Sequence, residues 1–195
     1  MDNRQERFLK FSLNSSDPIV AGSKRSEIVI RHEPKPFIER TYYFKIFVPS
    51  QKNNDIIPEI IAQWHGTPDK MLGEAWRSPP IALLISNNQF VLNIFYSSKK
   101  VNTNSESKFR QLLLGSVTKN KWISWKIHIK FSYSAEGIIE IWRDTTKIMD
   151  YNGPNYYNDI QGPYFKIGIY KWQWKNYKGK NNLKSEIFFD DIEIK

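Results

Sequence analysis

One short segment, residues 164–170, carries several side chains suited to acid–base chemistry. It reads Tyr-Phe-Lys-Ile-Gly-Ile-Tyr, and side chains in a strand alternate between two faces. Tyr164, Lys166 and Tyr170 therefore share one face, while the opposite face is apolar. We expect Gly168, on the same face as the polar side chains, to leave room for a ligand. This pattern predicts one wall of a sugar-binding groove.

A second segment, residues 63–65, reads Gln-Trp-His. In a strand Gln63 and His65 lie on the same face, about 6.6 Å apart along the chain. Together the two segments supply the residue types that β-elimination on a uronic acid needs. The proton beside the carboxylate can be removed only if donors or cations hold that carboxylate. Gln63 can donate to it, and Arg31 or Lys166 can add positive charge.

The reaction also needs a base for this proton and an acid for the departing glycosidic oxygen. A histidine has an ordinary pKa of about 6.5, so His65 can be a neutral base, and Tyr170 can supply the proton. Each side chain also has a purely structural interpretation. His65 can bond a backbone carbonyl within its strand, Tyr170 can cover a sheet face, and Lys166 can be solvated.

Short alternating segments separated by turn residues, with little helical periodicity, surround these motifs. The expected strands are 25–31, 42–48, 59–65, 81–86, 89–96, 122–133, 138–143, 164–170 and 186–194. Loops are expected at 67–80 and 172–183, and residues 1–24 are expected to be irregular or to form an edge strand. Without a repeat or a boundary, the pattern predicts one all-β domain over 1–195. Its expected fold is a jelly-roll sandwich of two antiparallel sheets with a concave substrate groove.

The composition limits the partners. The net charge is +9, from 29 Lys and Arg against 20 Asp and Glu, which favours a polyanion: nucleic acid, anionic lipid or acidic polysaccharide. The chain has no cysteine, so it forms neither disulfides nor thiolate metal sites. No apolar run is long enough to span a membrane. The charged first residues do not resemble a signal peptide. We expect a secreted or periplasmic protein shown without its signal, the alternative being a cytoplasmic one.

Further residues are candidates for substrate binding. They are basic or aromatic and lie either on the polar face of an expected strand or in a loop. This set contains Arg25, Arg31, Lys126, His128, Lys130, Tyr164, Trp76 and Trp172. The basic residues of 122–133 line the groove only if their strand belongs to the concave sheet. A solvated basic face, and tryptophans packed under loops, are the alternatives.

The two motifs in this order resemble the β-jelly-roll polysaccharide lyases. The similarity is greatest to the glucuronan-lyase and heparin-lyase-like group, and alginate lyases of the same fold are more distant. It extends from about Arg25 to the C-terminus and includes Arg-Ser-Glu-Ile at 25–28, Pro-Pro-Ile-Ala-Leu at 79–83 and Phe-Asp-Asp-Ile at 189–192. Where the family has a second arginine after Arg-Ser-Glu, this chain has Val29.

The resemblance implies a role for each motif residue. Gln63 would neutralise the substrate carboxylate, His65 would be the base and Tyr170 the acid, although some of these enzymes use the tyrosine for both steps. Lys166 would bind substrate or tune Tyr170. No cofactor would be required. Related lyases often bind calcium, so Asp190 and Asp191 are candidates for a structural calcium site.

Four functions compete. The leading hypothesis is an endo-acting lyase on a glucuronate-containing polysaccharide, active as a monomer, and the alternative is a non-catalytic carbohydrate-binding module. A glycoside hydrolase needs two carboxylates facing one bond, and Glu140 and Asp144 do not have that spacing. Nucleic-acid binding lacks any recognised motif, so neither nucleic acid nor membrane is expected as a partner.

Overall fold

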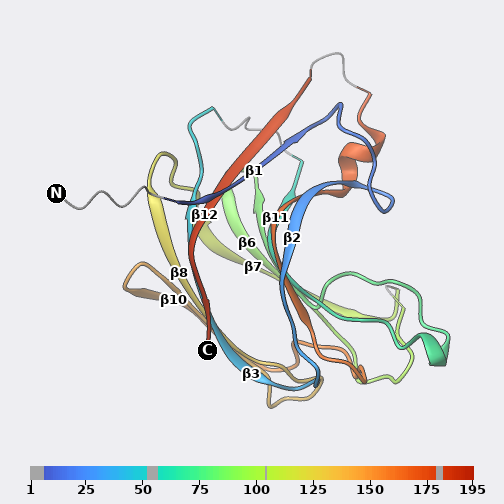
Figure 1. The fold of residues 1–195 in the computed structure, drawn as a ribbon. Helices are drawn as coiled ribbons and strands as arrows, with labels where there is room; N and C mark the ends of the chain where they lie inside the picture. Colours follow the sequence, from blue (N-terminus) through green and yellow to red (C-terminus); the bar gives the residue numbers. More distant parts are fainter. Residues whose placement is uncertain (1–6, 52–56, 104, 179–181) are drawn as a thin grey trace.

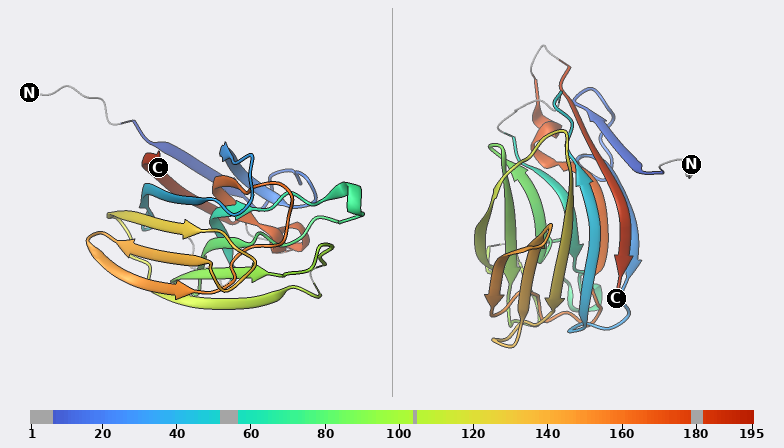
Figure 2. Two further views of the ribbon diagram at one scale, coloured as in Figure 1. Left: turned by 90° about the horizontal axis from the view of Figure 1, so that it is seen from below. Right: turned by 90° about the vertical axis from the view of Figure 1, so that its left-hand side faces the viewer.

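The protein is a sandwich of two six-stranded antiparallel sheets (Figures 1 and 2). The computed structural model describes residues 7–51, 57–103, 105–178 and 182–195. The first sheet has the order β1-β12-β3-β8-β9-β10, with β1 at Leu9–Asn14, β12 at Lys184–Ile194, β3 at Glu39–Phe47, β8 at Trp122–Lys130, β9 at Ile138–Arg143 and β10 at Thr146–Asn152.

The second sheet has the order β2-β11-β4-β5-β6-β7. Its bounds are Lys24–His32 for β2, Tyr164–Lys171 for β11, Glu59–His65 for β4, Ile81–Ser86 for β5, Gln89–Tyr96 for β6 and Lys108–Ser116 for β7. Two 3₁₀ helices complete the described part, η1 at Lys70–Leu72 and η2 at Trp172–Asn176. They lie at opposite ends of the second sheet (Figure 1). Neither is long and apolar enough to cross a membrane.

The expected jelly-roll sandwich is confirmed, and several strands match their predicted bounds. The hairpin of β5 and β6 turns at Asn87 and Asn88, whose φ angles of 48° and 58° suit the tight turn that asparagine tolerates. Two strands were missed, β7 and β10. Each is the edge strand of its sheet and is largely exposed, so neither has the alternating pattern of a half-buried strand.

β1 forms the other edge of the first sheet, within the segment 1–24 that was expected to be irregular or an edge strand. Residues 1–6 of that segment lie outside the described residues.

Apolar side chains between the sheets fix the position of β11. Phe165 lies against Trp64 of β4, with ring centroids 5.0 Å apart, and against Tyr42 of β3 at 4.9 Å. Ile167 and Ile169 are fully buried on the same face. Because alternation sends the neighbouring residues outward, this core contact determines which side chains β11 presents on the outer face of the second sheet.

Gly168 has a structural role that differs from the expected one. A Cβ at this position would lie 2.2 Å from the carbonyl oxygen of Ser26 and 2.7 Å from Cα of Glu27, both in the neighbouring strand β2. Its φ of 133° is also a conformation that other residues rarely adopt. The expectation that Gly168 leaves room for a ligand is therefore wrong, because the space is occupied by the backbone of β2.

Replacing Gly168 tests this close approach. We expect Gly168→Ala to lower the free energy of unfolding by about 1–3 kcal/mol beyond the cost of its φ angle, because β2 must move. Gly22→Ala is the matched control, since Gly22 has a φ of 77° but no heavy atom within 4 Å of its added Cβ. Urea unfolding measures both variants. Equal losses would show that backbone conformation alone requires glycine at 168.

Candidate active site

A groove of about 710 Å³ lies on the outer face of the second sheet. It brings together Gln63 and His65 of β4 with Lys166 and Tyr170 of β11, the four side chains singled out by the two sequence motifs. Four of the further candidates also line it, namely Arg25, Trp76, Tyr164 and Trp172. None of the described residues lining the groove is an aspartate or glutamate, so the groove suits an anionic ligand.

The strand register explains how distant segments meet in the groove. In the antiparallel pair of β11 and β4, Lys166 lies opposite Gln63 and Tyr164 lies opposite His65. On the other side of β11, Tyr170 lies opposite Arg25 of β2. The bulge at Ile61 of β4 turns Ile60 toward the groove, where it forms a small apolar cluster with Ala82 and neighbouring residues.

Glu27 holds the polar side chains of the groove in place. Its Oε1 accepts a hydrogen bond from Nε2 of Gln63, and its Oε2 lies 3.3 Å from Nζ of Lys166 and 3.6 Å from Nη1 of Arg25. The Glu27 carboxylate is almost fully buried. The sequence assigns Glu27 no role beyond its place in the Arg-Ser-Glu motif, because alternation alone does not show which groups a carboxylate contacts.

His65 is held as a neutral imidazole. Its Nδ1 lies 2.7 Å from the carbonyl oxygen of Gly66, and because a carbonyl only accepts, Nδ1 carries the hydrogen and Nε2 has the free lone pair. Burial, together with the positive charges of Lys166 and Arg77, lowers the pKa of His65 to about 4. The imidazole stacks on Tyr164 with centroids 5.2 Å apart.

Burial also shifts the pKa values of Lys166 and Tyr164, which line the groove. Lys166 is only 8% exposed, and burial lowers its pKa while Glu27 opposes that change. Burial and the charge of Glu27 raise the pKa of Tyr164 to about 12, so its phenol remains a hydrogen-bond donor at neutral pH. The guanidinium of Arg25 lies 4.5 Å from the ring centre of Tyr170 and holds the phenol from one side.

Four basic candidates lie outside the groove. Lys126, His128 and Lys130 belong to β8 in the first sheet, so the prediction that they line the groove is wrong. His128 contacts Glu39 and Thr41 of the neighbouring strand instead.

Arg31 is also displaced from the groove. A bulge between β2 and β11 pairs Val29 with Lys166 and Arg31 with the core residue Phe165. Arg31 therefore does not share the face of Lys166, and its Nε contacts Glu33 at 2.5 Å. The prediction that Arg31 reaches a ligand in this groove is wrong.

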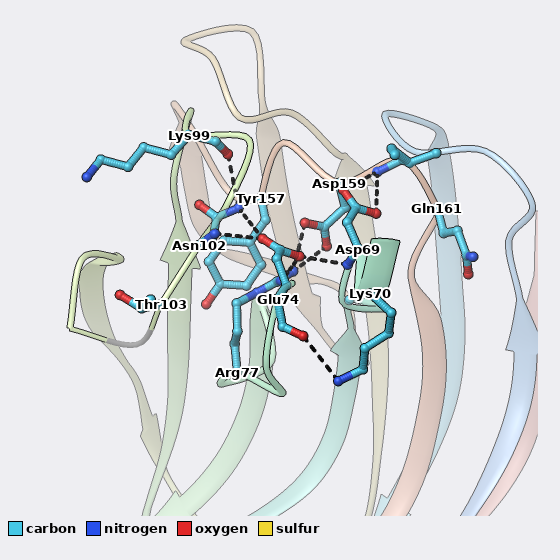
Figure 3. Close-up of polar contacts among 12 residues, drawn as sticks. Asp69, Lys70, Glu74, Arg77, Lys99, Asn102, Thr103, Tyr157, Asp159 and Gln161 are labelled. Atoms are coloured by element: carbon cyan, nitrogen blue, oxygen red, sulfur yellow. Dashed lines mark hydrogen bonds and ion pairs between the residues drawn. The ribbon is translucent and has the colours of Figure 1, made fainter. Parts of the chain in front are cut away.

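Figure 3 shows a cluster of charged side chains around Arg77, which lines the groove together with His65. Arg77 donates from Nη1 to Glu74 and from Nη2 to both oxygens of Asp159 at 2.7 Å, and its guanidinium stacks on Tyr157. Glu74 also accepts from the backbone and side-chain nitrogens of Asn102. The cluster joins three loops, two of which are also linked by an isolated bridge between Ser97 and Tyr157. Sequence reasoning missed it because single charges in loops have no periodicity.

This cluster is in contact with the backbone next to His65. A Cβ on Gly66 would lie 2.7 Å from Oδ2 of Asp159 and 3.6 Å from Nη2 of Arg77. Gly66 also supplies the carbonyl that orients the imidazole of His65. The charge cluster thus packs against the residue that orients the His65 imidazole.

Two clusters of acidic residues are candidate metal sites. Asp69, Glu74 and Asp159 have ligand atoms within 4.8 Å of one another, and Arg77 bridges two of these carboxylates. Asp190 and Asp191, the calcium candidates, lie in β12, where Asp191 pairs with Lys45 at 2.6 Å. Calcium at this position stays a prediction.

The comparisons with known proteins agree with this geometry. The family model described as "Polysaccharide lyase" matches residues 3–193. The chain belongs to the polysaccharide lyase family. The lyase resemblance seen in the sequence and the assignment as an enzyme, a polysaccharide lyase, are thereby confirmed. A comparison with curated protein sequences gives no match.

Solved structures of lyases share the fold. An endo-β-1,4-glucuronan lyase from the fungus Trichoderma reesei superposes with a TM-score of 0.76 at 19% identity, over 96% of this chain and 80% of that chain. The alginate lyase AlyC3, in complex with dimannuronate, gives 0.62 at 14% identity, over 96% and 74%. The family 7 alginate lyase AlgAT5 gives 0.64 at 13% identity, over 96% and 77%.

The charge cluster predicts a large and pH-dependent effect of removing Arg77. Arg77→Met leaves buried carboxylates without their counter-charge, so we expect a loss of about 3–5 kcal/mol of stability at pH 8. The loss should shrink at pH 5, because burial and the neighbouring carboxylates already raise the pKa of Asp159 to about 7 and it can take up a proton.

A double-mutant cycle with Asp159→Asn provides the control, measured by urea unfolding at both pH values. Asp159→Asn in the Arg77→Met background should recover part of the loss. Strictly additive effects of the two substitutions would contradict a coupled cluster.

Proposed function

We propose that this lyase cleaves a uronic-acid-containing polysaccharide by β-elimination. The observation that carries the proposal is that the Gln63–Lys166 pair and the two acid–base groups, His65 and Tyr170, line one cationic groove. Two structural neighbours, a glucuronan lyase and an alginate lyase in complex with dimannuronate, support a uronate as substrate.

The proposed reaction begins with neutralisation of the uronate carboxylate. Gln63 uses one amide hydrogen for Glu27 and retains a second for the substrate, since an amide nitrogen carries two. Lys166 adds positive charge next to it. These donors stabilise the enolate-like state that forms as the proton beside the carboxylate leaves.

The proton transfers follow from the protonation states in the groove. Nε2 of neutral His65 takes the proton from the carbon next to the carboxylate, and a double bond forms to the neighbouring carbon. The bond from that carbon to the glycosidic oxygen breaks, and the Tyr170 phenol protonates the departing oxygen. No water is consumed. A bound carboxylate also offsets the cations that lower the pKa of His65, so the substrate itself strengthens the base.

The proposal also covers the substrate, the cofactor requirement and the location of the protein. We propose a glucuronan-like substrate, because the glucuronan lyase gives a higher TM-score than the two alginate lyases quoted above. The side chains of the groove supply the acid, the base and the carboxylate donors, so the proposal requires no cofactor. Such a substrate would place the protein outside the cytoplasm, in keeping with the expected secretion.

The direct test is cleavage of a polysaccharide panel containing glucuronan, heparin, heparan sulfate, hyaluronan and alginate, with and without a chelator. We expect unsaturated products, detected by their ultraviolet absorbance, from at least one uronate polymer. His65→Ala and Tyr170→Phe should each abolish turnover while circular dichroism remains unchanged. His128→Ala, on the first sheet, is the matched control and should keep full activity. Binding without turnover by the unmodified protein would instead support a carbohydrate-binding module.

The pKa of His65 predicts the pH profile. The base must be neutral, and its pKa of about 4 in the free groove means that kcat/KM should fall only below about pH 4–5. The acid limb of kcat should lie at higher pH, because the bound carboxylate raises the pKa of His65. Lys166→Met removes a positive charge and should shift the kcat/KM limb upward. A limb near pH 6.5 that Lys166→Met leaves in place would contradict this assignment.

A further inference from the structure

The end of the groove farthest from His65 is built by η2 and the start of β2. In the pair of β11 and β4, Tyr164 lies opposite His65 and Tyr170 lies opposite Ile60, so η2, which follows β11, lies beyond Tyr170. Trp172 and Lys175 of η2 line the groove beyond this point. This end therefore faces the sugar unit on the leaving-group side of the bond that Tyr170 protonates, and not the unit whose proton His65 removes.

The geometry of η2 directs these two side chains to the same side. In a 3₁₀ helix, side chains three residues apart are eclipsed, so Trp172 and Lys175 share one face. Trp174 lies between them in sequence, points into the core and is 1% exposed. The helix thus has one buried face and one face that opens on the groove.

A buried network anchors η2. Nζ of Lys171 lies 4.5 Å from the ring centre of Trp174, donates to the Ile57 carbonyl at 3.1 Å and pairs with Glu59 at 3.6 Å. Glu59 in turn accepts a 2.6 Å hydrogen bond from Ser185. Since this support holds the backbone, Trp172 and Lys175 are positioned before any ligand arrives.

The two cations at this end of the groove, Arg25 and Lys175, differ in their partners. Arg25 shares its positive charge with Glu27, 3.6 Å away. Lys175 is exposed, and across the described ranges it forms no ion pair with a carboxylate. Its ammonium group is therefore available to bind an anionic ligand. The neighbouring indole of Trp172 contacts Tyr170, and the centroids of these two rings are 6.0 Å apart.

We propose that Trp172 and Lys175 form a distal subsite for a second uronate unit of the same polymer. The indole packs on the face of the sugar ring, and the Lys175 ammonium pairs with the carboxylate. This inference rests on the proposed function and adds to it. Because the ring face and the carboxylate of this neighbouring unit do not change during the reaction, their contacts bind the ground state and the transition state equally, and so lower KM without changing kcat.

Chain-length kinetics of Lys175→Met test the subsite, with Lys121→Met as the matched control because Lys121 is exposed and does not line the groove. We expect KM for the preferred polymer to rise about three- to fivefold, as the loss of an exposed ion pair implies. The value of kcat should not change. The increase should disappear at high salt, and also for oligosaccharides too short to reach η2.

The outcomes separate the two proposals. If Lys175→Met and Lys121→Met behave alike on the long polymer, or if kcat falls instead, the subsite is overturned while the lyase function stands. If the unmodified protein cleaves no polymer, the lyase proposal fails. Titration of the same polymers by tryptophan fluorescence then decides the subsite, which requires weaker binding by Lys175→Met than by Lys121→Met. Trp172→Phe should weaken binding less than Trp172→Ala, since a smaller ring still stacks.

Discussion

The chemistry of the groove depends on the register of β11 between β2 and β4. The inner face of β11 fixes that register, because Phe165 stacks on Trp64 and the two isoleucines that follow are fully buried. Side chains have a period of two in a strand, so a slip of one residue would turn Lys166 into the apolar core and the core side chains of β11 toward the groove. The apolar core thus specifies where the polar side chains meet, although none of its residues touches the groove.

The Glu27 carboxylate makes this arrangement electrostatically stable. Two cations and an amide converge on it, which compensates for the removal of Lys166 from water. One carboxylate cannot neutralise both Arg25 and Lys166, and therefore the groove keeps a net positive charge for a ligand. The same residue orients Gln63 and leaves one of its amide hydrogens free.

The sequence predicts well those features that a buried face controls. Alternation placed Gln63 and His65 on one face, and the structure agrees. Alternation reports a face but not the sheet to which it belongs, so His128 and its basic neighbours were assigned to the wrong surface. It also cannot show bulges, and the one in β2 moves Arg31 away from the groove. Arg77 lies in a loop, where buried charges leave no periodic signal.

The protonation state of His65 is linked to two networks, the contacts of Glu27 and the charge cluster around Arg77. Burial is the main cause of the lowered pKa of His65, and the positive charges of Lys166, Arg77 and Arg25 add to it. Arg77 remains buried only because Glu74 and Asp159 balance it, and burial in turn raises the pKa of Asp159 to about 7. An apolar wall would lack the positive charge of Arg77, which adds to the effect of burial on the pKa of His65. The buried charges therefore serve the protonation state of the base as well as the fold.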